Sequence, residues 1–240
     1  ISSGLVGSEM CIRDSYEGDK FVICSPNYNS NGLVRVFEIQ NSTIVQVGQD
    51  IVGTSSLILK NVSMNGLGNR IAISSPGNSE KIVIYDYLNN NWVSTSQTYG
   101  NGNFGYDMAL NYQGDRIFVG IPGNQSGYNN ANIGQAVVYD VSNWLQIGNS
   151  ISGYSGSGNL NAQVRLGNAV DIDSSGNTII VGAPGTDGPR DAGATYVYDW
   201  NGTSWTYSTG VQGTAADYNQ GSYVSISGNG RKFSTGASQQ

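Results

Sequence analysis

GNTIIVGAP, the stretch from Gly176 to Pro184, decides the fold, because four variants of it recur along the chain. Each variant begins at a glycine and runs through a short apolar segment, and three of them close on a proline. The fourth, from Gly230 to Ser238, has serine in place of the proline. Self-similarity at a period of about 53 residues is typical of a repeat architecture. The variants begin at Gly18, Gly68, Gly114 and Gly230.

The composition favours one array of short strands joined by tight turns. The chain has 240 residues, of which 34 are glycine, and only 12% are charged. Glycine accepts the positive φ angles that tight turns need, and so does asparagine more readily than most residues. The net charge of −6 argues against a nucleic-acid partner, because such a protein needs a basic face to neutralise phosphates.

Missing residue types exclude several kinds of active site. The chain has no histidine, which removes the commonest general base, the commonest zinc ligand and every Ser-His or Cys-His nucleophile pair. The two cysteines, Cys11 and Cys24, form no CxxC motif, and we expect Cys24 to be a small buried thiol. The sequence contains no run of 18 apolar residues, so we expect no membrane-spanning segment in it.

Residues 1–15 fit the repeat poorly. The run from Gly4 to Ser15, GLVGSEMCIRDS, resembles a translated sequencing adapter of the kind that contaminates environmental assemblies. We therefore set residues 1–15 apart as a non-native segment, although Met10 and Ile12 could still lie on a strand. The chain also stops within its fifth repeat, so we expect it to be a fragment of a longer protein.

Each repeat contains four expected strands, which are clearest in the fourth copy. The first, from Leu166 to Asp173, has a period of two, and the second, 178–182, is almost continuously apolar, which predicts burial on both faces. A loop over 186–192 leads to a third strand, 193–200, and an Asn-Gly turn leads to an outer strand around Trp205. The sequence thus predicts an all-β protein of four-stranded antiparallel sheets.

Aromatic residues recur at fixed places in the repeats. The outer strand is expected to carry Trp92, Trp144 and Trp205, with Ile44 in the first copy. Recurrence favours packing between neighbouring sheets, whereas stacking against carbohydrate is the alternative for the same tryptophans. The third strand ends each time in an aromatic residue and an acid: Phe37-Glu38, Tyr85-Asp86, Tyr139-Asp140 and Tyr198-Asp199.

Two short motifs carry a resemblance to a known family. Phe104-Gly105 opens the first strand of the third copy, and Gly182-Ala183-Pro184 closes the second strand of the fourth. With the phrases SSGNTIIVGAP and AGATYVYDWNGTSW, these motifs make the chain resemble the FG-GAP repeats of integrin-α-like β-propellers, in the shorter bacterial and marine form typical of metagenomic sequences. The second copy departs from the pattern, because Ile58-Leu59 replaces Phe-Gly.

The resemblance implies a β-propeller in which each repeat is one four-stranded antiparallel blade, and the propellers of this family usually have seven. Residues 16–240 hold about four and a half blades, so a closed seven-bladed ring does not fit in this chain. Closure with four blades would leave the strand around Phe233 as an exposed edge. The blades are expected at about 16–54, 55–100, 101–153, 160–213 and, in part, 214–240.

The resemblance also raises calcium as a cofactor, since many FG-GAP repeats hold it in a D-x-D-x-D-G loop between the first two strands. Calcium takes roughly six to eight oxygen ligands, several of them from carboxylates. Asp171, Asp173 and Ser175 stand at the three ligand positions, but the loop is one residue short, and Thr178 and Ile179 replace the closing acid. We therefore expect no cofactor, with calcium at Asp171, Asp173 and Ser175 as the alternative.

No other group of residues has the pattern of an active site. The turn of the fourth copy departs in its spacing from the Asp box of sialidase-type propellers. Arg70 and Arg116 align with Lys20, and we interpret them as repeated structural residues. Asp187 and Asp191 could form a carboxylate pair for glycoside hydrolysis, but a solvated loop is the simpler interpretation.

These observations favour a non-catalytic binding or adhesion module of a secreted or cell-surface protein. We expect an unidentified protein or glycan ligand at the loops 123–133 and 185–192, no nucleic-acid partner, and an extracellular or cell-surface location. Two alternatives stay open: a structural spacer repeat in a large surface protein, and a polysaccharide hydrolase or lyase of the propeller type whose catalytic residues lie in missing blades.

Overall fold

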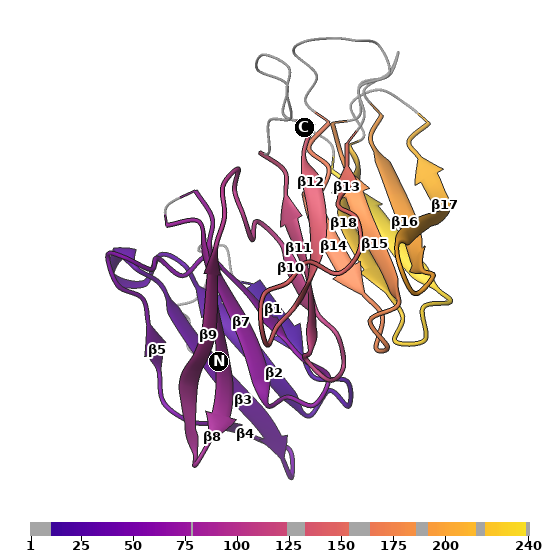
Figure 1. Cartoon of the computed structure of the whole chain (residues 1–240). Coiled ribbons are helices and arrows are strands. Elements are labelled where there is room, and N and C mark those ends of the chain that lie inside the picture. The colour runs from indigo at the N-terminus through magenta and orange to yellow at the C-terminus, as the bar shows by residue number, and fades with distance from the viewer. Residues whose placement is uncertain are drawn as a thin grey trace.

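The protein is all-β (Figure 1), as the alternating and apolar patterns predict. A computed structural model of the chain describes residues 11–77, 79–123, 133–153, 164–185, 192–214 and 219–238. Within these ranges the chain forms 19 strands and one short 3₁₀ helix, Tyr28–Ser30.

The strands form five antiparallel sheets that follow one another along the chain, from the indigo sheet to the yellow one in Figure 1. The first sheet contains β1 (Cys11–Asp14), β2 (Lys20–Ser25), β3 (Leu33–Gln40) and β4 (Thr43–Gln46), and β5 (Ile51–Val52) also pairs with β3. The second contains β6 (Asn61–Met64), β7 (Arg70–Ser75), β8 (Lys81–Leu88) and β9 (Asn91–Tyr99). The third contains β10 (Met108–Leu110), β11 (Arg116–Ile121), β12 (Gln135–Asp140) and β13 (Ile151–Ser152). The fourth contains β14 (Ala169–Ile172), β15 (Thr178–Ala183), β16 (Ala194–Trp200) and β17 (Trp205–Gln212), and the fifth β18 (Gln220–Ile226) and β19 (Phe233–Ala237).

The expected plan of four strands in sequence order is confirmed for the second, third and fourth sheets, whereas the first sheet has a fifth strand and the fifth sheet has two strands. Two further differences concern particular residues. Trp144 does not lie on an outer strand, so that expectation is wrong: it follows a turn after β12 with a φ of +58°, and the outer strand of that sheet begins only at Ile151. The first sheet takes Cys11–Asp14 as its first strand, although these residues belong to the segment that the sequence sets apart. The interpretation of residues 1–15 as a non-native segment stays a prediction.

The second strand of each complete sheet supplies side chains to both faces. In β7, Ile71 and Ile73 pack in one buried cluster with Val22 of the first sheet, whereas Ala72 lies in another cluster with Phe104. Successive side chains of a strand point to opposite faces, so a sheet packed on both sides requires a continuous apolar run. The same arrangement holds in β15, where burial on both faces is confirmed.

A close backbone approach between consecutive sheets explains the small residue near the end of the second strand. A Cβ atom on Gly120 would lie 2.0 Å from the carbonyl oxygen of Gly167 in the next sheet. One on Gly182 would lie 2.0 Å from that of Gly221. Gly167 and Gly221 each have a φ of +90°, which glycine adopts without steric cost. These glycine pairs fix the distance between neighbouring sheets.

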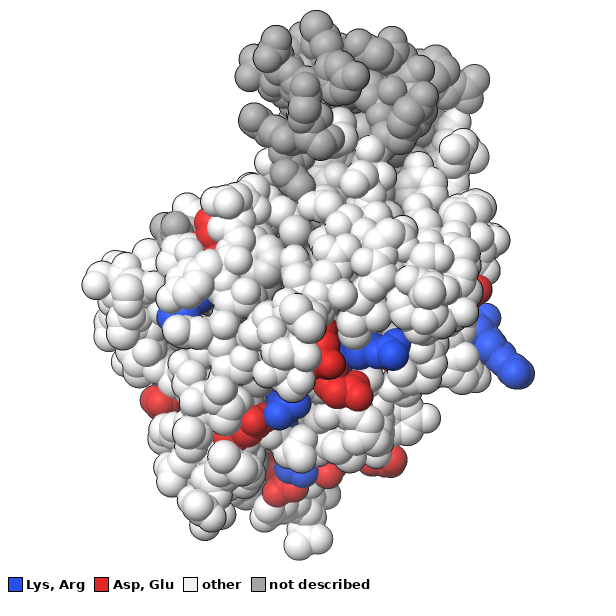
Figure 2. All heavy atoms as spheres, in the orientation of Figure 1, with Lys and Arg blue, Asp and Glu red and all other residues white. Residues whose placement is uncertain are grey.

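Arginine side chains make a second link between sheets. Arg70 binds Asp86 across its own sheet, with 2.6 Å between Nε and Oδ1, and its Nη1 donates to the carbonyl oxygen of Gly114, which starts the next repeat. Arg116 donates in the same way to the carbonyl oxygen of Gly176, at 2.7 Å. The interpretation of both arginines as repeated structural residues is confirmed. Figure 2 shows the wider distribution of charge: most of the charged side chains in view lie in the lower half of the molecule.

Two recurring tryptophans are buried between sheets. The indole Nε1 of Trp92 donates to the carbonyl oxygen of Val47 at 2.8 Å, and that of Trp205 donates to Ile147 at 2.9 Å. Both acceptors belong to the preceding repeat, and both indole rings are buried. The packing interpretation is therefore confirmed for Trp92 and Trp205, which expose no ring face for carbohydrate.

Gly120→Ala is expected to lower the free energy of unfolding by about 2–3 kcal/mol, because the added methyl group meets the Gly167 carbonyl and forces the sheets apart. Gly18→Ala is the control: its φ is +70°, but nothing lies within 4 Å of the added Cβ. It should cost only about 1 kcal/mol of backbone strain. Urea unfolding measures both, and equal losses in the two variants would contradict the packing argument.

Asp86→Asn removes the ion pair with Arg70 and is expected to lower the free energy of unfolding by about 1 kcal/mol at neutral pH. The loss is this small because solvent partly screens the pair. Burial alone would raise the pKa of Asp86, but hydrogen bonds from Arg70 and Thr95 bring it below the ordinary 3.8. A lowered folded-state pKa stabilises the protein above that ordinary value, and the stabilisation is lost as the pH falls through the folded pKa. Urea unfolding from neutral pH to about pH 3 should show the difference from wild type shrinking, and a constant difference would refute this account.

Candidate functional site

The turn between the first and second strands has the same hydrogen bond in all five sheets. A side-chain oxygen at the end of the first strand accepts the backbone N–H of the residue at or just before the start of the second, over 2.9 to 3.1 Å. Such bonds close the turn without a ligand. The accepting residues are Ser15, Asn65, Asn111, Asp173 and Ser227.

The expected calcium ligands serve these backbone contacts. Asp173 is buried, and its Oδ1 accepts the N–H groups of Asn177 and Thr178 while its Oδ2 accepts the Ser175 hydroxyl at 2.7 Å. Asp171 accepts the N–H of Ile172 through Oδ1, and its Oδ2 accepts a backbone N–H of the fifth sheet. In two other sheets the uncharged residues Asn65 and Asn111 accept the equivalent backbone N–H. The hydrogen bonds that Asp173 makes in its turn therefore need no metal.

These hydrogen bonds argue against calcium at Asp171, Asp173 and Ser175, because the carboxylate oxygens already accept N–H and O–H groups of the protein, but the calcium alternative stays a prediction. The part of the chain that the structure describes contains no group of three or more His, Cys, Asp or Glu residues suited to a metal.

The first strands of the five sheets line a cavity of about 1090 Å³. They contact one another in chain order, β1 with β6, β6 with β10, β10 with β14 and β14 with β18. Tyr16, which follows β1, connects the first sheet with the third and the fifth. Its ring lies edge-on to the ring of Tyr112 in the third sheet, with 5.5 Å between the centroids, and a Cβ atom on Gly228 of the fifth sheet would lie 2.8 Å from the Tyr16 ring. The cavity thus receives side chains from every sheet.

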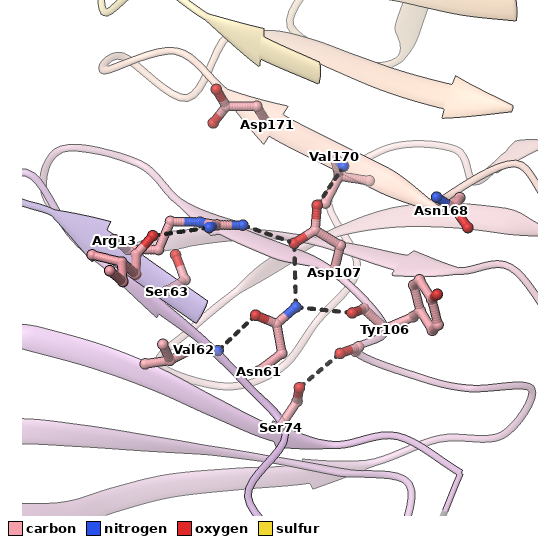
Figure 3. Close-up of polar contacts among 12 residues, drawn as sticks. Arg13, Asn61, Val62, Ser63, Ser74, Tyr106, Asp107, Asn168, Val170 and Asp171 are labelled. Atoms are coloured by element: carbon pink, nitrogen blue, oxygen red, sulfur yellow. Dashed lines mark hydrogen bonds and ion pairs between the residues drawn. The ribbon is translucent and has the colours of Figure 1, made fainter. Parts of the chain in front are cut away.

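Asp107 is the centre of the polar contacts in this cavity (Figure 3). Its Oδ1 accepts from Arg13 at 3.2 Å and from the Asn61 amide at 3.3 Å, and its Oδ2 accepts the N–H of Val170 at 2.9 Å. One carboxylate thereby joins four sheets. Sequence reasoning missed Asp107; the available signal was that Asp107 and Asn61 occupy the same place in two repeats, where the surrounding strand is apolar.

Asp171 is a second carboxyl group on the cavity wall, in β14. Burial raises the pKa of Asp171, the N–H groups of Ile226 and Ile172 oppose that rise, and the nearby charge of Asp107 adds to it. In Figure 3 Arg13 points to Asp107 rather than to Asp171. The two acids therefore have different surroundings within one cavity.

The other expected sites are only partly described. Most of the loops 123–133 and 185–192, with Asp187 and Asp191, lie outside the described residues. No helix within the described ranges is long and apolar enough to cross a membrane. The described geometry has a polar, partly open cavity between the sheets, at a place that the sequence did not indicate.

No protein-family model matches the chain, and no curated protein is significantly similar to it in sequence. The resemblance to FG-GAP repeats therefore stays a prediction that depends on the quoted motifs.

Asp173→Asn is expected to keep nearly the stability of the wild type, because the amide oxygen can accept the same backbone N–H groups as Asn65 and Asn111 do. Asp173→Ala should lose about 1–2 kcal/mol, since buried N–H groups lose their acceptor. Thermal unfolding with and without calcium measures both, and calcium should leave the midpoint of the wild type unchanged. A calcium-dependent rise that Asp173→Asn abolishes would overturn this assignment.

Proposed function

We propose that the sheets of the chain are β-propeller blades and that the chain is a non-catalytic binding module of a secreted or cell-surface protein. The observation that carries the proposal is the cavity that the first strands of all five sheets line together. Sheets in chain order whose first strands share one cavity match blades arranged around a propeller axis. The motif resemblance and the low charge support an extracellular location.

The contacts of the cavity favour binding over catalysis. A general acid must carry a proton that it can release, and a nucleophile must have a free approach to the substrate. Asp107 instead accepts hydrogen bonds from three donors, and both oxygens of Asp171 accept backbone N–H groups, so neither side chain is left free to act on a substrate. A structural spacer does not require polar side chains from several sheets to converge on one cavity, so the cavity favours a binding module over a spacer.

The purified chain is expected to bind at least one ligand on arrays of glycans and immobilised extracellular proteins, without releasing any product from it. Arg165→Ala should weaken that binding by about tenfold, because Arg165 lines the cavity. Arg35→Ala is the matched control, since Arg35 forms a solvent-exposed ion pair with Asp50 and does not line the cavity.

Equal binding by both variants would contradict the cavity as the binding site. Turnover of a polysaccharide by the wild type would contradict a non-catalytic function.

A further inference from the structure

We propose that the cavity binds a neutral oligosaccharide. This inference depends on the proposed function as a binding module, and it adds the chemical class of the ligand. It is argued from the charge of the lining, the state of the strand edges, and the exposed aromatic faces.

The charges of the cavity are nearly balanced. Two arginines and three aspartates belong to its lining. Arg13 is paired with Asp107, and Arg165 donates to the side-chain oxygen of Asn168 at 3.1 Å. An anionic ligand would have to compete with Asp107 for Arg13, and a cationic ligand would have to displace backbone N–H groups from Asp171. The electrostatics therefore favour a ligand without net charge.

Three backbone N–H groups on the strand edges that face the cavity already bind side chains. A peptide that binds as an added strand needs free N–H and C=O groups along an edge. Three N–H groups there are instead bound by side chains of the preceding sheet: Leu110 by Ser63 at 3.0 Å, Val170 by Asp107 at 2.9 Å, and Ile226 by Asp171 at 2.8 Å. These caps recur from sheet to sheet, and they argue against an extended peptide as the occupant.

The lining retains polar groups suited to sugar hydroxyls. A sugar hydroxyl both donates and accepts, so it matches amides, carboxylates and serine hydroxyls equally well. Asn168 presents an amide beside Arg165, and Asp107 keeps a lone pair on the oxygen that binds Val170. Ser174, Ser222 and Ser238 contribute hydroxyls to the same cavity.

Exposed tyrosines supply the apolar faces that sugar rings need. Tyr16, Tyr106 and Tyr223 line the cavity, and their exposed fractions are 63%, 40% and 70%. Their hydroxyl groups make no hydrogen bond within the described residues, so each combines a partly exposed ring with a free polar end. Such a side chain suits a ligand that is apolar on its C–H faces and polar around its edge. Trp92 and Trp205 are buried and cannot contact a sugar ring, whereas the tyrosines of the cavity are exposed enough to do so.

The test is a titration of the purified chain with defined oligosaccharides of neutral hexoses, alongside sulfated and uronic-acid oligosaccharides and extended peptides. We expect a neutral oligosaccharide to bind, with an affinity that does not change as sodium chloride is raised, because no ion pair forms. Tyr106→Ala and Tyr223→Ala should each weaken binding by about tenfold. Tyr223→Phe should keep most of the affinity, since the ring face remains.

Tyr99→Ala is the matched control, because Tyr99 is 62% exposed on β9 and is absent from the cavity lining. Salt-sensitive binding of only the charged oligosaccharides, binding of peptides alone, or neutral binding that both tyrosine variants leave intact would each overturn the inference while leaving a binding module. Failure to bind any member of the three classes would count against the proposed function itself. Circular dichroism of each variant establishes that the fold is kept.

Discussion

The close approach of backbones between consecutive sheets is the constraint on which the rest of this structure depends. Gly120 and Gly182 have no room for a side-chain atom, because a carbonyl oxygen of the next sheet lies where a Cβ would be. Their partners Gly167 and Gly221 add a backbone conformation that other residues adopt only with strain. The spacing that results lets the second strands bury apolar side chains on both faces, and that burial supplies the main stabilisation of the array.

The same spacing brings the first strands together around one cavity. At that distance a side chain on one first strand reaches the backbone of the next, as Asp107 reaches Val170 and Asp171 reaches Ile226. These hydrogen bonds occupy backbone N–H groups on the strand edges, which could otherwise pair with another strand. They also leave a polar wall of nearly balanced charge, on which the proposals of a binding module and of a neutral ligand are based.

The repeated turn shows that different residue types can make the same hydrogen bond. Asp171, Asp173 and Ser175 have the spacing of a partial calcium loop, yet the carboxylate of Asp173 accepts the same N–H as the side chains of Ser15 and Asn65 do. A spacing motif shows which donor and acceptor atoms are present, but it does not show which of them bind one another in the folded protein. Trp144 is a similar case, since its alignment with Trp92 and Trp205 predicted a strand where the chain makes a turn.

The sequence by itself determined the repeat, the all-β class, the four strands of the second, third and fourth sheets, and the burial of the second strand. These follow from local periodicity and from residues such as the starting glycines, whose φ angles of +65° to +74° are needed within a single turn. Only the tertiary structure decided that Asp107 joins four sheets and that Tyr106 and Tyr223 line the same cavity. The residues that meet in these contacts lie far apart in the sequence, and nothing in a local pattern specifies which side chains meet after the sheets pack.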